Sequence, residues 1–156
     1  QFTSSMNPSQ INMPKVIGKR TARDQLLPRN DGRFFLSRPM QLTAVERARL
    51  DAQAGQKIAV IGTGEFVTVP FLVAEHLAQQ GAIVDCVATS RSPIFIGHAI
   101  QHKQEFMDPY GDHIVNFIHN LQPDHYDRIL LCLESPHSAH PITQLGQLTV
   151  EPIYLG

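Results

Sequence analysis

The chain has 156 residues, of which 42% are hydrophobic, with a formal net charge of −1 and a pI near 6.8. This length accommodates one domain with a hydrophobic core and an additional arm. The near-neutral charge excludes the broad basic surface typical of nucleic-acid-binding proteins. No apolar run approaches the roughly 20 residues of a membrane span. The chain also lacks a signal-peptide pattern, so we expect a cytoplasmic protein.

Residues 1–43 predict an extended arm or interdomain linker, because prolines and glycines interrupt every short apolar patch. Its basic residues are Lys15, Lys19, Arg20, Arg23, Arg29, Arg33 and Arg38. Phe34, Phe35 and Leu36, followed by Met40, form an apolar patch that needs a surface to cover it. The arm is therefore either a solvated linker or a segment that binds RNA or a partner subunit. We expect the patch to pack on its own domain or on a second copy, which would form a homodimer through the arm.

The first regular elements surround an apolar, β-branched run at residues 58–61. Before it, Thr43 and Glu46 predict the capping box of a short helix that Gly55 ends. After it, residues 68–80 predict a helix, with a proline in its first turn and a glycine directly after its last residue. The chain thus passes from a strand through a glycine-containing loop into a helix.

The second part of the chain alternates between apolar and polar stretches. Residues 82–89 are nearly all apolar, as is typical of a parallel strand covered on both faces. Residues 96–106 are compatible with a helix, and residues 114–118 with a short strand. Between them, the residues 108–112 have turn chemistry.

The last part contains a third apolar run at residues 126–135, which predicts a buried strand. Residues 138–145 then predict a short helix closed by Gly146, and residues 148–154 a final strand. Cys86 and Cys132 lie inside apolar runs, so we expect buried free thiols, which fit a reducing compartment.

This order predicts a three-layer, Rossmann-like α/β domain over residues 44–156, preceded by the extended arm of residues 1–43. Right-handed crossovers give a mainly parallel sheet of four or five strands with helices on both faces. The runs at 58–61, 83–88 and 129–133 should be neighbours in that sheet.

Loops that follow parallel strands lie at one edge of the sheet, where open α/β sheets bind ligands. Three such loops are expected to meet there: residues 62–65, 90–93 and 134–137. The candidate ligand-binding residues in these loops are Gly62, Thr63, Gly64, Glu65, Ser90, Arg91, Ser92 and Ser135. Backbone donors, hydroxyls, a guanidinium and carboxylates suit a phosphorylated sugar or a nucleotide.

The most specific expectation is an anion between Gly62–Gly64 and Ser90–Ser92, because a helix begins after the first loop and Arg91 lies in the second. In the empty site, Glu65 would pair with Arg91; in the filled site, it would meet a ribose hydroxyl. Simpler interpretations stay open: a structural turn, a surface arginine and glutamates that only stabilise helix N-termini. The loop lacks the third glycine of the dinucleotide fingerprint, which argues against a nicotinamide site.

Catalysis would have to use a carboxylate, because no Ser–His or Cys–His pair is evident. Glu65 and Glu134 are the candidates. The histidine pairs His98 with His102 and His137 with His140 lack a further Cys or carboxylate at a ligand spacing, so no dedicated metal site is expected. The cofactor stays open, with Mg²⁺ accompanying a phosphorylated ligand as the candidate.

Three motifs occur in order: Ile61-Gly-Thr-Gly-Glu-Phe66, Thr89-Ser-Arg-Ser-Pro-Ile94 and Tyr126-Asp-Arg-Ile-Leu-Leu-Cys132. Together they resemble the TRSP domain, which is named for its Thr-Arg-Ser-Pro motif. The resemblance covers roughly residues 57–135. Ser90 stands where the motif has threonine, a change that keeps the hydroxyl and loses a methyl group.

The resemblance implies a domain at the carboxyl end of phosphoribosyltransferase-like proteins from bacterial gene neighbourhoods for tellurium resistance and stress response. The phosphoribosyltransferase activity would reside in a preceding domain, and this domain would recognise a phosphate, phosphosugar or nucleotide. Two alternatives stay open: an enzyme acting on a phosphorylated ribosyl or nucleotide substrate through Glu65 or Glu134, and a purely structural oligomerisation domain.

Overall fold

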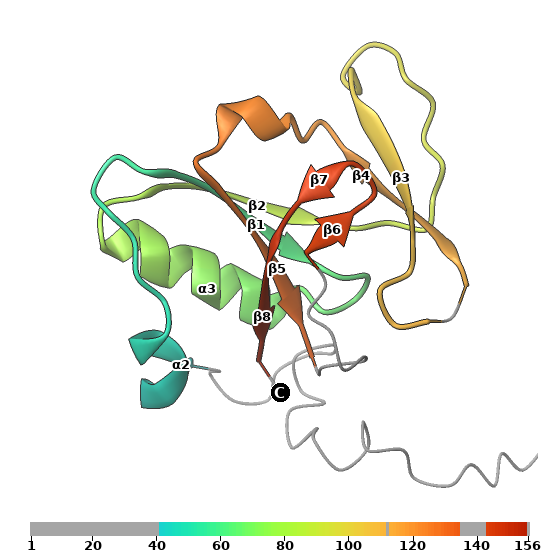
Figure 1. The fold of residues 1–156 in the computed structure, drawn as a ribbon. Helices are drawn as coiled ribbons and strands as arrows, with labels where there is room; N and C mark the ends of the chain where they lie inside the picture. The colour runs from blue at the N-terminus through green and yellow to red at the C-terminus, as the bar shows by residue number, and fades with distance from the viewer. Residues whose placement is uncertain (1–40, 112, 135–142, 156) are drawn as a thin grey trace, which may run out of the picture.

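The computed structural model describes residues 41–111, 113–134 and 143–155 (Figure 1). Its elements are α2 (Ala44–Ala48), β1 (Lys57–Gly62), α3 (Thr68–Gln79), β2 (Ile83–Ala88), β3 (Lys103–Met107), β4 (Val115–His119), η3 (Pro123–His125), β5 (Arg128–Leu133), β6 (Gln144–Leu145), β7 (Leu148–Thr149) and β8 (Glu151–Tyr154). The expected arm lies almost entirely outside these residues, as do Ser135, His137 and His140. No helix in this part of the chain is long and apolar enough to cross a membrane.

A four-stranded parallel sheet with the order β2-β1-β5-β8 forms the centre of the molecule. The three runs expected to be sheet neighbours are therefore confirmed, with β1 between β2 and β5. From Ile58 to Gly62 every residue of β1 is buried, because the strand has a neighbour on each side and a covering layer on each face. The α/β class with a parallel sheet is as the sequence predicts.

One face of the sheet is covered by α3, as the apolar positions of the 68–80 segment predict. Val69, Val73 and Leu77 are fully buried there against Ile58 and Leu130. The capping box is also confirmed, although α2 ends at Ala48 and not at Gly55.

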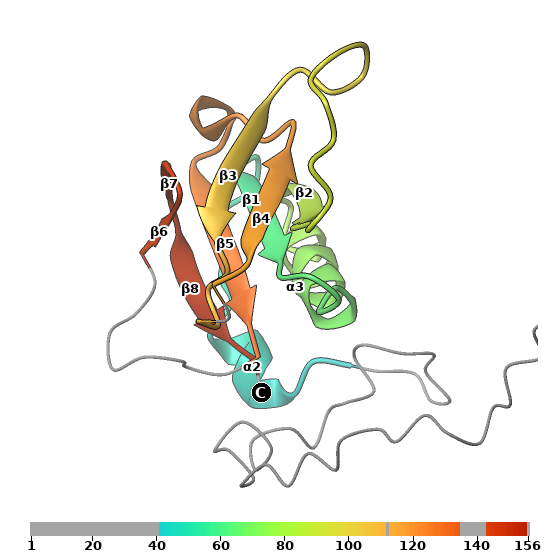
Figure 2. The same ribbon diagram turned by 90° about the vertical axis from the view of Figure 1, so that its right-hand side faces the viewer.

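The other face is covered by strands, so the expectation of helices on both faces is wrong for the described residues. Phe106 of β3 and Ile118 of β4 pack in one cluster with Ile61 and Leu131. Figures 1 and 2 show this antiparallel β3–β4 ribbon across the sheet from α3. The helical pattern of residues 96–106 is weak, and the cross-strand backbone hydrogen bonds that β4 supplies stabilise a strand here instead.

At the edge of the sheet, β2 differs from the expected strand covered on both faces. It has β1 on one side, and in the described residues no strand on the other. Ile83 is 58% exposed, and Cys86 is exposed although its partial burial still raises the pKa of the thiol. Only Cys132 is a buried thiol as expected. An apolar composition thus indicated a strand without indicating its place in the sheet.

The carboxyl-terminal part also differs from the prediction. Residues 144–145 form β6, which turns at Gly146 (φ 63°) into β7, so this end of the expected 138–145 helix is a strand. Thr143 is not helical, and residues 138–142 lie outside the described part. The expected 148–154 strand is divided at Val150 into β7 and β8.

Candidate functional site

The loops after β1 and β2 meet at the carboxyl edge of the sheet, as the sequence predicts. The backbone N–H of Gly64 donates to Oγ1 of Thr89 at 2.7 Å. In return, the N–H of Thr89 donates to the carbonyl oxygen of Gly62 at 2.9 Å. Two hydrogen bonds therefore join the loops, and one of the N–H groups expected to face an anion is already engaged.

The loop between β1 and α3 is closed by its own backbone. Phe66 N–H donates to the carbonyl of Thr63, and Val67 N–H to the carbonyl of Glu65, each at 3.0 Å. A Cβ at Gly62 would lie 2.6 Å from the carbonyl oxygen of Phe66, so this turn requires glycine. Gly64 has φ +58° and open space around it, so its requirement is conformational.

No side chain caps the start of α3. Val67 occupies the N-cap position and makes no capping hydrogen bond. The first-turn N–H groups of an α-helix have no partner within the helix, so this end can accept an anion or a carboxylate. The helix begins directly after the loop that holds Gly62 and Gly64, where the sequence predicts an anion.

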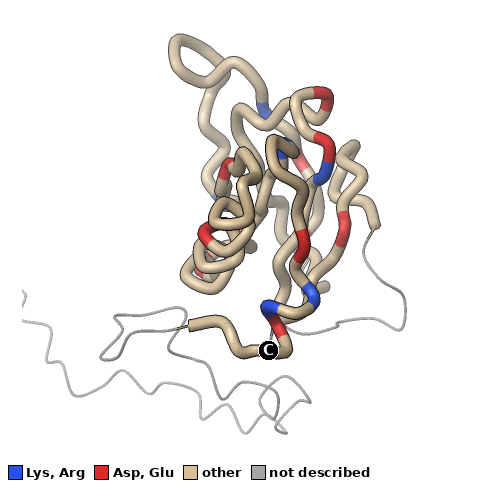
Figure 3. The backbone as a smooth tube through the Cα atoms, turned by 90° about the vertical axis from the view of Figure 1, so that its left-hand side faces the viewer, with Lys and Arg blue, Asp and Glu red and all other residues tan. Residues whose placement is uncertain are grey.

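Arg91 and Glu65 are both exposed, and the structure does not pair them. Ion pairs between described residues are Lys103 with Glu105 and Arg128 with Glu151. The expected Glu65–Arg91 contact of an empty site is therefore not formed. Acidic residues recur on several segments of the described chain, where basic residues are fewer (Figure 3).

The Ser90–Ser92 loop is anchored to β4. Ser90 and Phe117 exchange two backbone hydrogen bonds, at 2.9 and 2.7 Å. The Ser90 hydroxyl accepts the N–H of Ser92 at 3.0 Å, so it already supports the loop's own turn. The anchoring holds the start of this loop beside the sheet and leaves Arg91 exposed to solvent.

Buried polar residues gather at the same edge. Thr63, Thr89 and Glu134, which follow β1, β2 and β5, are each at most 6% exposed. The Tyr110 hydroxyl lies 2.7 Å from Oγ1 of Thr63 and 3.4 Å from the backbone nitrogen of Glu134, whose N–H donates to it. Burial of polar groups is unfavourable unless they are hydrogen-bonded, so these contacts stabilise a cluster of buried polar residues at this edge.

Tyr110 is the residue that sequence reasoning missed, since residues 108–112 predicted only a turn. It lies between β3 and β4, and its N–H donates to the Asp108 carboxylate at 2.6 Å. The one sequence signal for this residue was an aromatic side chain within a segment of turn-forming residues. Its contact with Thr63, far along the chain, depends on how the β3–β4 ribbon packs.

The two candidate carboxylates have different surroundings. Glu134 is buried directly after β5, and its backbone N–H donates to the Tyr110 hydroxyl, whereas Glu65 is exposed on its loop. Among the described residues, no group of three His, Cys, Asp or Glu side chains could hold a metal ion.

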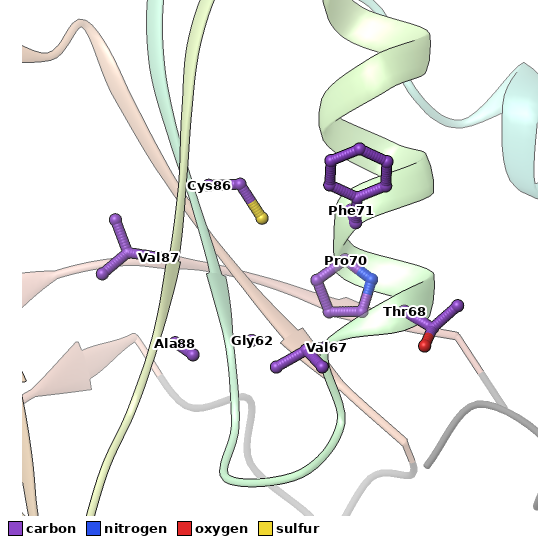
Figure 4. Close-up of a pocket in the computed structure, with 8 residues that line it drawn as sticks. All are labelled: Gly62, Val67, Thr68, Pro70, Phe71, Cys86, Val87 and Ala88. Atoms are coloured by element: carbon purple, nitrogen blue, oxygen red, sulfur yellow. The ribbon is translucent and has the colours of Figure 1, made fainter. Parts of the chain in front are cut away.

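An apolar groove of about 520 Å³ lies beside the loop, between the start of α3 and β2. It is lined by Gly62, Val67, Thr68, Pro70, Phe71, Cys86, Val87 and Ala88 (Figure 4). The Cys86 sulfur points toward α3 in this view. We call this the α3–β2 groove; nothing in the sequence indicated it, because it forms where a helix end meets an edge strand.

Comparison with protein families identifies a match over most of the chain. The family model described as the TRSP domain C-terminal to PRTase_2 matches residues 30–149. No curated protein and no solved structure matches the chain.

Proposed function

The chain belongs to the TRSP domain family, whose description places it C-terminal to a phosphoribosyltransferase-like domain, and from this premise we propose that it recognises a phosphorylated ribosyl compound or nucleotide. The ligand's phosphate would lie at the start of α3, between Gly62–Gly64 and Ser90–Ser92. In this proposal the domain serves a larger biosynthetic protein of bacterial stress response and presents the ligand to its phosphoribosyltransferase-like part.

The observation that carries the proposal is the joined pair of loops beside an uncapped helix. The Gly64–Thr89 hydrogen bond holds the second loop against the first, and α3 begins there without a side-chain cap. Arg91 lies two residues beyond Thr89 and is exposed, without an ion-pair partner in the described residues. Helix N–H groups together with a guanidinium favour a phosphate.

The first test is the Arg91→Ala variant, titrated calorimetrically with ribose 5-phosphate and with AMP. A charge-assisted hydrogen bond contributes roughly 1.5–3 kcal/mol, so binding should weaken about tenfold to a hundredfold. Thermal stability should stay unchanged, because the side chain is exposed. Lys57→Ala is the matched control, since it removes one positive charge at the opposite end of β1. Equal affinities of wild type and Arg91→Ala would refute the site.

An enzyme acting through Glu134 is the second candidate, favoured by the burial of this acidic residue at the carboxyl edge of the sheet. As base or metal ligand, Glu134 would act on the same phosphorylated ligand, with Mg²⁺ as the accompanying ion. Metal-dependent release of phosphate or pyrophosphate by wild type, abolished in Glu134→Gln, would establish the enzyme. Binding without turnover supports recognition alone.

A further inference from the structure

The α3–β2 groove leaves apolar side chains open to solvent. Phe71 is 60% exposed and Val67 42%, and both line the groove. Val67 and Phe71 are one helical turn apart at the start of α3, and Cys86 of the edge strand lines the same groove. An exposed apolar depression of this kind is suited to an apolar segment.

The chain itself carries an apolar segment that can reach it. The described residues begin at Gln41, one residue before Leu42. Leu42 is buried in the same cluster as Val69. Phe34–Leu36 precede Leu42 by six to eight residues, and an extended chain of that length spans about 20–29 Å. The whole of α3 is only about 18 Å long, so the groove is within reach.

Charge favours the same contact. Residues 1–40 contain seven basic and two acidic residues, a net charge of +5, whereas residues 41–156 have six basic and twelve acidic residues, a net charge of −6. Arg33 and Arg38 flank the apolar patch, and the exposed Glu65 lies on the loop beside the groove. Opposite net charges draw the segment toward its own domain.

The family match begins at residue 30, before the described domain starts, so the segment around Phe34 belongs to the same family unit as the sheet. We propose that Phe34-Phe35-Leu36 folds back and occupies the α3–β2 groove of its own chain. This contact covers Cys86. It also brings Arg33 and Arg38 to the side of the loop that holds Gly62 and Gly64; their use in anion binding rests on the proposed function, whereas the docking does not.

Cys86 provides the readout, because it lines the groove while Cys132 is buried. The full chain is labelled with a maleimide reagent at one pH, and the rate is compared with that of a Phe34→Ser/Phe35→Ser variant. Removing the occupant should accelerate Cys86 labelling at least tenfold. The matched control is Phe95→Ser, which alters a phenylalanine that is 91% exposed on another loop and should leave the rate unchanged.

Dilution distinguishes the occupant of one chain from that of a second copy. Protection of Cys86 that persists at nanomolar concentration supports the intramolecular contact, whereas protection lost on dilution assigns the groove to a second copy and overturns it. Equal labelling rates of wild type and the double variant also overturn it. Phe71→Ser alters the groove itself; it should increase cleavage by trypsin after Arg33 while circular dichroism confirms the fold.

Discussion

Tyr126 makes a specific polar contact at the surface of the molecule. Its hydroxyl donates to the Asp85 carboxylate of β2 at 2.8 Å. The pKa of the phenol is raised from 10.0 to about 12, first by burial and then by the hydrogen bond and charge of Asp85. The neutral phenol is the donor, so folding favours it. This contribution to stability is complete below pH 10 and is lost as the pH rises from 10 to about 12.

An alkaline titration followed at 295 nm checks this. The difference between wild type and Tyr126→Phe should show a midpoint near 12. Asp85→Asn should lower that midpoint toward 10 without reaching it, because burial is the largest cause and remains. An Asp85→Asn midpoint equal to that of wild type would show that the carboxylate is not the partner in solution.

The element that organises the site is the passage from β1 through its loop into α3. The two positions in this loop require glycine for different reasons. At Gly62 the carbonyl of Phe66 approaches so closely that a Cβ has no room, whereas Gly64 has a positive φ and free space around it. The two glycines therefore specify a tightly closed loop. The loop suits an anion because it places the start of α3 at this edge of the sheet.

Two alanine variants separate these reasons. Gly62→Ala should lower the free energy of unfolding by about 1–3 kcal/mol, because an added methyl group forces the backbone apart. Gly64→Ala should cost about 1–2 kcal/mol through its left-handed conformation. Urea unfolding measures the free energy that each variant loses. Gly62→Ala with wild-type stability would contradict the close approach to Phe66.

At the scale of the whole molecule, the sheet is unequally protected. β1 and β5 are interior strands, and β2 has an edge that no described strand covers. Local opening follows burial and hydrogen bonding, so exchange rates should differ among strands of one sheet.

Amide hydrogen exchange followed by NMR should show the slowest exchange in β1 and β5. The outward N–H groups of β2 should exchange faster than the amides of β1, by at least an order of magnitude. The inward N–H groups of β2, which bond to β1, are the internal control. Equal protection of all β2 amides would reveal a further strand on that edge.

Features that depend on neighbouring residues could be predicted from the sequence alone. The Thr43–Glu46 capping box, the start of α3 at Thr68 and the buried β5 run each depend on neighbours within a few positions, and each is confirmed. The meeting of the first two loops was also predictable, because parallel strands bring their carboxyl ends to one edge. The family was recognised from the motifs themselves.

Only the tertiary structure decided which surfaces those elements cover. The exposure of Cys86 follows from the edge position of β2, and the contact of Tyr110 with Thr63 follows from the β3–β4 ribbon replacing an expected helix. An apolar run identifies a strand but not its neighbours, since strand order is set by long-range packing. For the same reason the α3–β2 groove could not be predicted from the sequence. It arises where the start of α3 lies beside the end of β2, and no local pattern encodes the distance between these two elements.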